Sequence, residues 1–140
     1  MESRIHIAEE KHSKGYNCAQ AIVCTYCDLF GIDEETAFRI SEGFGLGMGN
    51  MQSTCGALSG VIMLASLKNS NGLVSPGSTK ASTYKIVKQL SEEFREMNTS
   101  IVCKDLKGID DGVVKRTCPG CIEDAAQLVE KYLIGDIEEN

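Results

Sequence analysis

The sequence has no tryptophan, only four tyrosines and four phenylalanines, and no basic run longer than Lys115-Arg116. A surface that binds nucleic acid needs clustered cations to pair with phosphates, and a base-stacking platform needs aromatic rings. The net charge of −6 and the sequence pI of about 4.9 are also those of an acidic protein. The composition therefore argues against nucleic acid as a partner.

Long hydrophobic stretches are missing as well. The longest largely apolar run, Val61 to Leu67, falls far short of the roughly 20 residues that a membrane-spanning helix needs. The first residues of the chain are polar and charged, unlike the start of a secretory signal. We therefore expect a cytoplasmic protein without a membrane span.

Cysteine, by contrast, is abundant, with seven in 140 residues. The cytosol keeps thiols reduced, so a disulfide framework is a poor explanation there, and metal binding or redox catalysis is the more common reason. An odd number also leaves at least one thiol unpaired in any scheme. The function of this chain is therefore expected to depend on its thiols.

Hydrophobic residues recur at helical spacing along most of the chain. Residues 43–50 hold four glycines, which predicts an irregular loop rather than a helix, and the polar residues 69–79 predict an exposed loop. The expected fold is all-α: one domain over 1–140, a compact multi-helix bundle of about five main helices, with the Gly-rich loop before the central Cys-bearing helix and a frayed tail at 136–140. The predicted helices cover 3–14, 18–30, 34–42, 53–68, 80–97, 101–107 and a last one from 119.

Helix starts are predicted at capping residues, and the cysteines gather there. We expect Asn17, Asp33 and Ser53 to act as N-caps. Backbone N–H groups and the positive end of the helix dipole stabilise a thiolate at such positions, and the thiolate is both the nucleophile and the metal ligand. The cysteines expected near helix N-termini are Cys18, Cys55, Cys103, Cys118 and Cys121.

The other two cysteines are expected to be structural. Cys24 and Cys27 have C-x-x-C spacing but lie in the middle of a predicted helix, with Cys27 beside the apolar face and Cys24 on the polar side. Free cysteine often packs as a small hydrophobic residue. Cys118 and Cys121, in contrast, open a helix, where a C-x-x-C can close a disulfide or supply two metal ligands.

Several of these features occur together in one known family. They resemble the C_GCAxxG_C_C family of redox-active proteins, named for a cysteine, a CGAxxG-type motif and two later cysteines, and the resemblance spans roughly residues 10 to 130. It implies that Cys18, Cys55, Cys103 and Cys118 are the four family cysteines, with Cys24, Cys27 and Cys121 as additions. The matching segments are Asn17-Cys18-Ala19-Gln20-Ala21, the glycine loop 43–49, Cys55-Gly-Ala-Leu-Ser-Gly60, Cys103 and Cys118.

Three functions fit this pattern. The first is dithiol/disulfide exchange with a redox partner protein or a small thiol or oxidant, in which Cys55 attacks and Cys18, Cys103 or Cys118 resolves. The second is a zinc or iron–sulfur site with Cys18, Cys55, Cys103 and Cys118 as ligands. The third is a non-enzymatic helical adaptor whose thiols only pack. Cys121 joins the redox candidates as part of the C-x-x-C.

The glycines and histidines are weaker candidates for residues of the functional site. Gly45, Gly47, Gly49 and Gly56 are candidate walls of the site because they lie near Cys55 in the chain, although their main expected role is close helix packing. His6 and His12 are six residues apart, which does not place them on one helix face, so we expect solvated or half-buried histidines.

Overall fold

The computed structural model describes residues 1–135, and the frayed tail expected at 136–140 lies outside the described residues. The fold is all-α, as predicted, and none of the described helices is long and apolar enough to cross a membrane. The main helices are α1 Ile5–Ser13, α2 Cys18–Tyr26, α3 Glu34–Ser41, α5 Gly56–Asn69, α6 Lys80–Asn98 and α8 Cys118–Leu128, with short helices α4 Gly45–Met48 and α7 Cys103–Lys107. Four further segments are 3₁₀ or π turns: Cys27–Phe30, Glu42–Phe44, Gly72–Val74 and Val129–Ile134.

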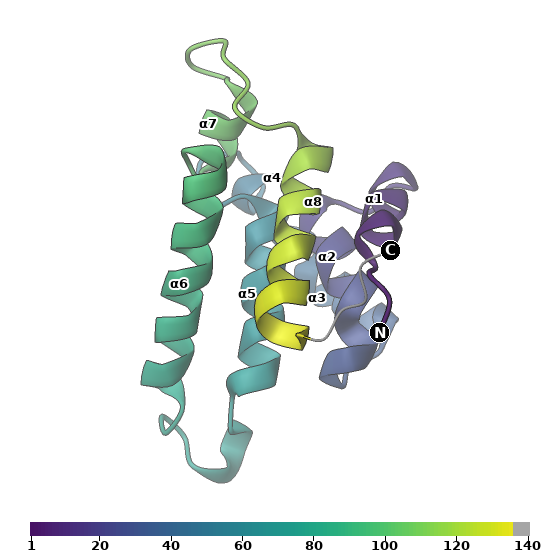
Figure 1. The fold of residues 1–140 in the computed structure, drawn as a ribbon, viewed down its shortest axis with the longest axis vertical. Coiled ribbons are helices and arrows are strands. Elements are labelled where there is room, and N and C mark those ends of the chain that lie inside the picture. Colours follow the sequence, from purple (N-terminus) through teal and green to yellow (C-terminus); the bar gives the residue numbers. More distant parts are fainter. Residues whose placement is uncertain (136–140) are drawn as a thin grey trace.

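The helices form one bundle around α2 and α5. Figure 1 shows α5 and α6 as a long hairpin, with α8 running beside α5 and with α1, α2 and α3 grouped on the other side of α8. Helix α2 packs on α1, α3, α5 and α8 and is buried along almost its whole length. The two helices with the most extensive mutual contact, α2 and α5, therefore carry the centre of the core.

The burial of α2 corrects one expectation about its faces. Cys24 was predicted to lie on a polar side, but only 4% of its surface is exposed. Helix α3 covers that side, since the Gln20 side chain donates to the Phe38 carbonyl and the Cys24 thiol donates to the Glu34 carbonyl. Cys27 is buried as well, so both cysteines pack in the core as small hydrophobic residues.

The apolar residues that recur at helical spacing along α6 are only partly buried. Leu90 and Phe94 are covered, but Tyr84 is 64% exposed and Met97 45% exposed. Helix α6 packs mainly on α5 and α8, so its apolar residues extend beyond the surface that these two helices cover. Helix α6 thus contributes less to the core than its sequence pattern suggested.

Two predicted caps are confirmed and one is wrong. The Asn17 side chain accepts from the Gln20 amide while the Gln20 side chain accepts from the Asn17 amide, and the Asp33 side chain accepts from the Thr36 amide. Ser53 does not cap α5, because that helix begins at Gly56 with Cys55 in the N-cap position. The last helix begins one residue earlier than predicted, at Cys118, and Thr117 caps it.

Two glycines allow α5 to approach α2 closely. A Cβ atom added at Gly60 would lie 2.9 Å from Ile22 Cβ and 3.1 Å from the Ala19 carbonyl oxygen. One added at Gly56 would lie 3.3 Å from the Ala19 amide nitrogen of α2 and 3.0 Å from the Phe44 carbonyl oxygen. The C-G-A-L-S-G segment therefore holds the start of α5 against the start of α2, which is how Cys55 and Cys18 come near each other.

Gly60→Ala is expected to destabilise the protein although it places alanine in a helix. Alanine gains about 1 kcal/mol of helix propensity over glycine, but crowding in a packed interface costs about 1–3 kcal/mol. We expect a net loss of about 1 kcal/mol in the free energy of unfolding, measured with urea. Gly43→Ala is the matched control: its added Cβ meets no atom within 4 Å, so stability should stay the same or rise. Equal effects of the two substitutions would contradict this account of α5.

Candidate functional site

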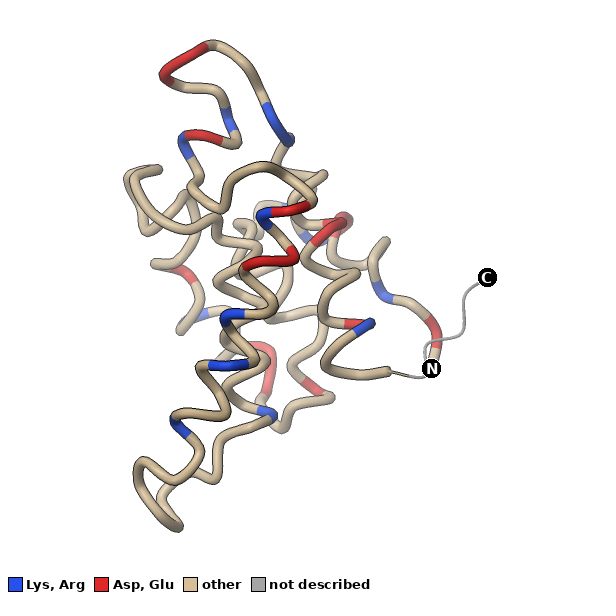
Figure 2. Tube along the Cα trace, turned by 60° about the vertical axis from the view of Figure 1, so that its left-hand side comes forward, with Lys and Arg blue, Asp and Glu red and all other residues tan. Residues whose placement is uncertain are grey.

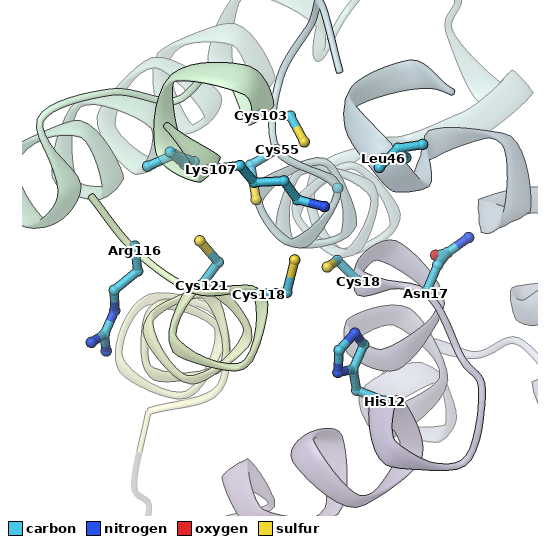
Figure 3. A pocket seen from close by; sticks show the side chains of 12 residues that line it. His12, Asn17, Cys18, Leu46, Cys55, Cys103, Lys107, Arg116, Cys118 and Cys121 are labelled. Atoms are coloured by element: carbon cyan, nitrogen blue, oxygen red, sulfur yellow. The ribbon is translucent and has the colours of Figure 1, made fainter. Parts of the chain in front are cut away.

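The N-terminal ends of α2, α5, α7 and α8 meet around one cavity of about 170 Å³. Figure 3 shows the side chains that surround it, with the sulfur atoms of different helices facing one another. Cys18, Cys103 and Cys118 are the first residues of their helices, Cys55 is the N-cap of α5, and Cys121 lies in the first turn of α8. The lining residues are His12, Asn17, Cys18, Leu46, Cys55, Gly56, Cys103, Leu106, Lys107, Arg116, Cys118 and Cys121.

A short antiparallel bridge positions two of these cysteines. Thr54 pairs with Val102, the Cys55 amide donates to the Ile101 carbonyl at 2.7 Å, and the Cys103 amide donates to the Ser53 carbonyl at 3.0 Å. The bridge leads directly into α5 on one strand and α7 on the other. Two segments far apart in the sequence therefore deliver their cysteines to the same wall of the cavity.

The start of α8 delivers the other pair. The Thr117 hydroxyl accepts from the Gly120 amide at 3.2 Å and fixes the first turn, which places Cys118 and Cys121 one turn apart. Gly120 leaves room for Arg116, whose Nε would lie 2.5 Å from an added Cβ. Arg116 then lies over the helix start and forms two hydrogen bonds with Asp124, at 3.0 and 3.1 Å.

The outer thiol pair is Cys18 and Cys118, both partly exposed. The Cys18 thiol donates a hydrogen bond to Cys118, and this contact lowers the pKa of Cys118 to about 5, assisted by the charges of Lys107 and His12 and opposed by burial. The same contact, together with burial and the charge of Cys118, raises the pKa of Cys18. This pair therefore holds a thiolate beside a thiol at the mouth of the cavity.

The inner thiol pair is Cys55 and Cys121, which are 5% and 3% exposed. The Cys121 thiol donates to Cys55 and so lowers the pKa of Cys55, with the amides of Ala57 and Leu58 acting in the same direction and burial opposing. The hydrogen bond and then burial raise the pKa of Cys121. The inner pair repeats the thiolate–thiol arrangement of the outer pair, deeper in the protein.

Cys103 has a different environment. It is 5% exposed, and burial raises its pKa although the nearby charge of Lys107 opposes this. The hydrogen bonds that pair the other four thiols do not include it. Of the four cysteines that the family resemblance singled out, Cys103 is thus the one without a thiol partner among the described residues, whereas the added Cys121 has one.

Lys107 is the cation that faces the sulfurs. Burial opposes its charge, but the negative charge of Cys118 outweighs this and raises the pKa of Lys107. Figure 2 shows basic and acidic residues alternating from α7 through the loop that leads to α8. Two other lysines of that region pair with this loop's aspartates, Lys104 with Asp110 at 3.2 Å and Lys115 with Asp111 at 3.3 Å. Lys107 instead places its ammonium group beside the thiols (Figure 3).

The four glycines expected to form walls of the site lie in three different environments. Gly56 lines the cavity. Gly45 and Gly47 lie behind lining residues: an added Cβ would lie 2.4 Å from the Asn17 side chain and 2.5 Å from Cys103 Cβ, respectively. Gly49 is exposed, has a φ of +86° and meets nothing within 4 Å, so the expectation that it forms a wall is wrong. It ends the irregular α4, in which Leu46 and Gly47 have left-handed backbone angles.

Sequence reasoning missed the cations of the site. Lys107 follows Cys103 by four residues, so helical spacing could have placed both on one face of a short helix. His12 was expected to be merely solvated or half-buried, and it is half-buried but lines the cavity. Nothing in its spacing from Cys18 indicates this, because the contact depends on how α1 packs against α2 and α8.

The cysteines of the cavity form two pairs of thiols. A zinc or iron–sulfur site needs three or four ligands directed at one point. Over residues 1–135 no group of three or more His, Cys, Asp or Glu side chains is placed to hold a metal ion. The adaptor alternative requires inert thiols throughout, whereas the pKa values of Cys118 and Cys55 are lowered.

Comparison with known proteins identifies the family. A family model described as "Putative redox-active protein (C_GCAxxG_C_C)" matches residues 16–132. No curated protein and no solved structure matches the chain. The matched region includes all five cysteines of the cavity and Lys107, and it covers most of the sequence. The chain therefore belongs to the C_GCAxxG_C_C family of redox-active proteins.

Proposed function

We propose that this protein carries out thiol–disulfide exchange in the cytoplasm, with Cys118 as the attacking thiolate and Cys18 as the resolving thiol. The observation that carries the proposal is that the partly exposed thiols of Cys18 and Cys118 lie side by side in the cavity (Figure 3), where the pKa of Cys118 is lowered to about 5. At neutral pH such a group is ionised, and the thiolate is the reactive form. Cys55, expected from the sequence to attack, is too buried for a first encounter with substrate.

The reaction proceeds in two displacements. Cys118 Sγ attacks one sulfur of a substrate disulfide, a Cys118–substrate bond forms, and the other substrate sulfur leaves as a thiolate. Cys18 Sγ then attacks Cys118 Sγ and displaces the second substrate thiolate. One released sulfur takes the proton of Cys18 and the other takes a proton from water. The substrate gains two electrons and the protein loses two, and the reverse sequence delivers a disulfide to a dithiol partner.

The environment of Cys18 changes between the first and the second displacement. Before attack, the hydrogen bond to Cys118 and the charge of Cys118 keep Cys18 protonated. Once Cys118 is bound to substrate, that negative charge is gone, while Lys107 still favours a thiolate at Cys18. Cys18 therefore becomes a nucleophile only after Cys118 has reacted.

The cavity limits what reaches the thiols. Its volume of about 170 Å³ admits a group the size of one side chain, such as a small disulfide or oxidant or one projecting disulfide of a redox partner protein. Lys107 adds positive charge at this entrance, which His12 also lines. We expect substrates that present a sulfur beside an anionic group.

A thiol count tests this function. The seven free thiols of the reduced protein should fall to five with one equivalent of diamide, an azo compound that takes up two electrons and two protons from two thiols. Dithiothreitol should restore seven. In Cys118→Ser the rapid loss of thiols should disappear. No loss in the wild type, or an equally fast loss in Cys118→Ser, would show that Cys118 does not start the reaction.

A further inference from the structure

The inner thiol pair is unused by the exchange reaction. Cys55 and Cys121 are almost fully buried, yet they repeat the hydrogen-bonded arrangement of the outer pair. Cys121 is outside the four cysteines of the family pattern, but it is the residue that completes this second pair. Both side chains also line the same cavity as the outer pair (Figure 3).

The four paired sulfurs form a path from the surface inward. Cys118 and Cys121 lie one turn apart at the start of α8, with Cys118 beside Cys18 and Cys121 beside Cys55 (Figure 3). Electrostatic effects also cross between the pairs, from Cys118 to Cys55 and from Cys18 to Cys121. The order Cys18, Cys118, Cys121, Cys55 therefore leads from two partly exposed thiols to two buried ones.

We infer that the inner pair is a second redox store, and that a disulfide formed between Cys18 and Cys118 is passed through Cys118–Cys121 to Cys55–Cys121. This rests on the proposed exchange function, because the outer pair must be oxidised first. Each chain then holds two electron pairs, and the outer pair is returned to its reactive state after the first turnover.

The transfer balances in two exchanges. The Cys121 thiol gives its proton to Cys55 and attacks Cys118 Sγ, so that the Cys18–Cys118 bond breaks and Cys18 leaves as a thiolate. Proton exchange with solvent leaves Cys18 as the thiol and Cys55 as the thiolate. Cys55 Sγ then attacks Cys121 Sγ, and Cys118 leaves as a thiolate. One disulfide, one thiol and one thiolate are present before and after, and no other reactant is consumed.

Burial gives the transfer its direction. A charge is costly to keep in a buried position and less costly where solvent reaches it. Transfer consumes a thiolate at Cys55, which is 5% exposed, and regenerates one at the partly exposed Cys118. Lys107 and His12 then stabilise the regenerated charge.

The experiment is a titration of the reduced protein with one and then two equivalents of diamide, followed by thiol counting and disulfide mapping by mass spectrometry. At one equivalent we expect mainly the Cys55–Cys121 disulfide with Cys118 free. At two equivalents we expect the thiols to fall from seven to three. A wild-type count that stops at five, or a disulfide that stays at Cys18–Cys118 after one equivalent, would overturn the store.

Variants separate this inference from the exchange function. Cys55→Ser and Cys121→Ser should each start with six thiols and lose only two. Cys24→Ala, a core cysteine outside the cavity, should start with six and lose four, as the wild type does. If Cys118→Ser still forms the Cys55–Cys121 disulfide at the wild-type rate, oxidant reaches the inner pair directly and both proposals fail. If Cys118→Ser is inert but Cys55→Ser loses four thiols, only the store fails.

Discussion

Cys118 should be alkylated by iodoacetamide at a rate that is constant above about pH 6 and falls to half near pH 5. The sign follows from the lowered pKa: the thiolate persists above the pKa and is protonated below it. At pH 6 an ordinary thiol is less than 1% ionised, whereas Cys118 is about 90% ionised. A thiolate of low pKa is also a weaker nucleophile, which leaves a net advantage of roughly tenfold at pH 6. The measurement is the rate of modification by peptide mass spectrometry.

The contact with Cys18 is the main cause of that low pKa, and Lys107→Met tests the contribution of the lysine charge. It keeps the apolar part of the side chain and removes the charge that faces Cys118, so the acid limb of the profile should move up by about one pH unit. Lys104→Met, which removes a lysine paired with Asp110, should leave the profile in place. In urea the Cys118 profile should become that of an ordinary thiol. An unchanged profile in Lys107→Met would mean that Lys107 does not help to stabilise the thiolate.

Gly47→Ala is expected to have the largest effect on stability. An added Cβ would lie 2.5 Å from Cys103 Cβ and 2.9 Å from the Ser53 carbonyl oxygen, and the residue has a φ of +55°. Left-handed backbone costs a non-glycine residue about 1–3 kcal/mol, and overpacking adds about 1–3 kcal/mol. We therefore expect a loss of roughly 2–6 kcal/mol in the free energy of unfolding, measured with urea.

Gly49→Ala separates the two contributions. Gly49 also has a positive φ, +86°, but its added Cβ meets nothing within 4 Å, so only the backbone cost applies. We expect Gly49→Ala to lose clearly less stability than Gly47→Ala. Similar losses at the two positions would mean that Gly47 is required for its backbone angle and not for the space it leaves to Cys103.

The fold was largely predictable because helical periodicity and caps are local properties of the chain. Asn17 and Asp33 cap their helices as expected, and the loop at 69–79 is exposed. The errors come from tertiary packing. Ser53 could not cap α5, because its carbonyl belongs to the bridge with residue 103, and Cys24 is buried because α3 covers a side of α2 that looks polar.

The candidate site was predictable in part for the same reason. The placement of cysteines at helix starts follows from local sequence, and it was confirmed for Cys18, Cys55, Cys103, Cys118 and Cys121. Which thiol pairs with which depends on how the helices meet, so no spacing rule linked Cys121 to Cys55. The same limitation applies to His12 and Lys107, since they come from α1 and α7, which are far apart in the sequence.

The bridge between Thr54 and Val102 has a consequence for folding. It joins segments almost 50 residues apart, and the outer thiol pair joins segments 100 residues apart. Contacts between such distant segments carry a loop-closure cost and belong to the slow part of folding. During synthesis and early collapse each cysteine is thus an ordinary thiol, largely protonated at neutral pH. Reactivity appears only when the helices have packed, by which time Cys18 already lies beside Cys118 and Cys55 beside Cys121.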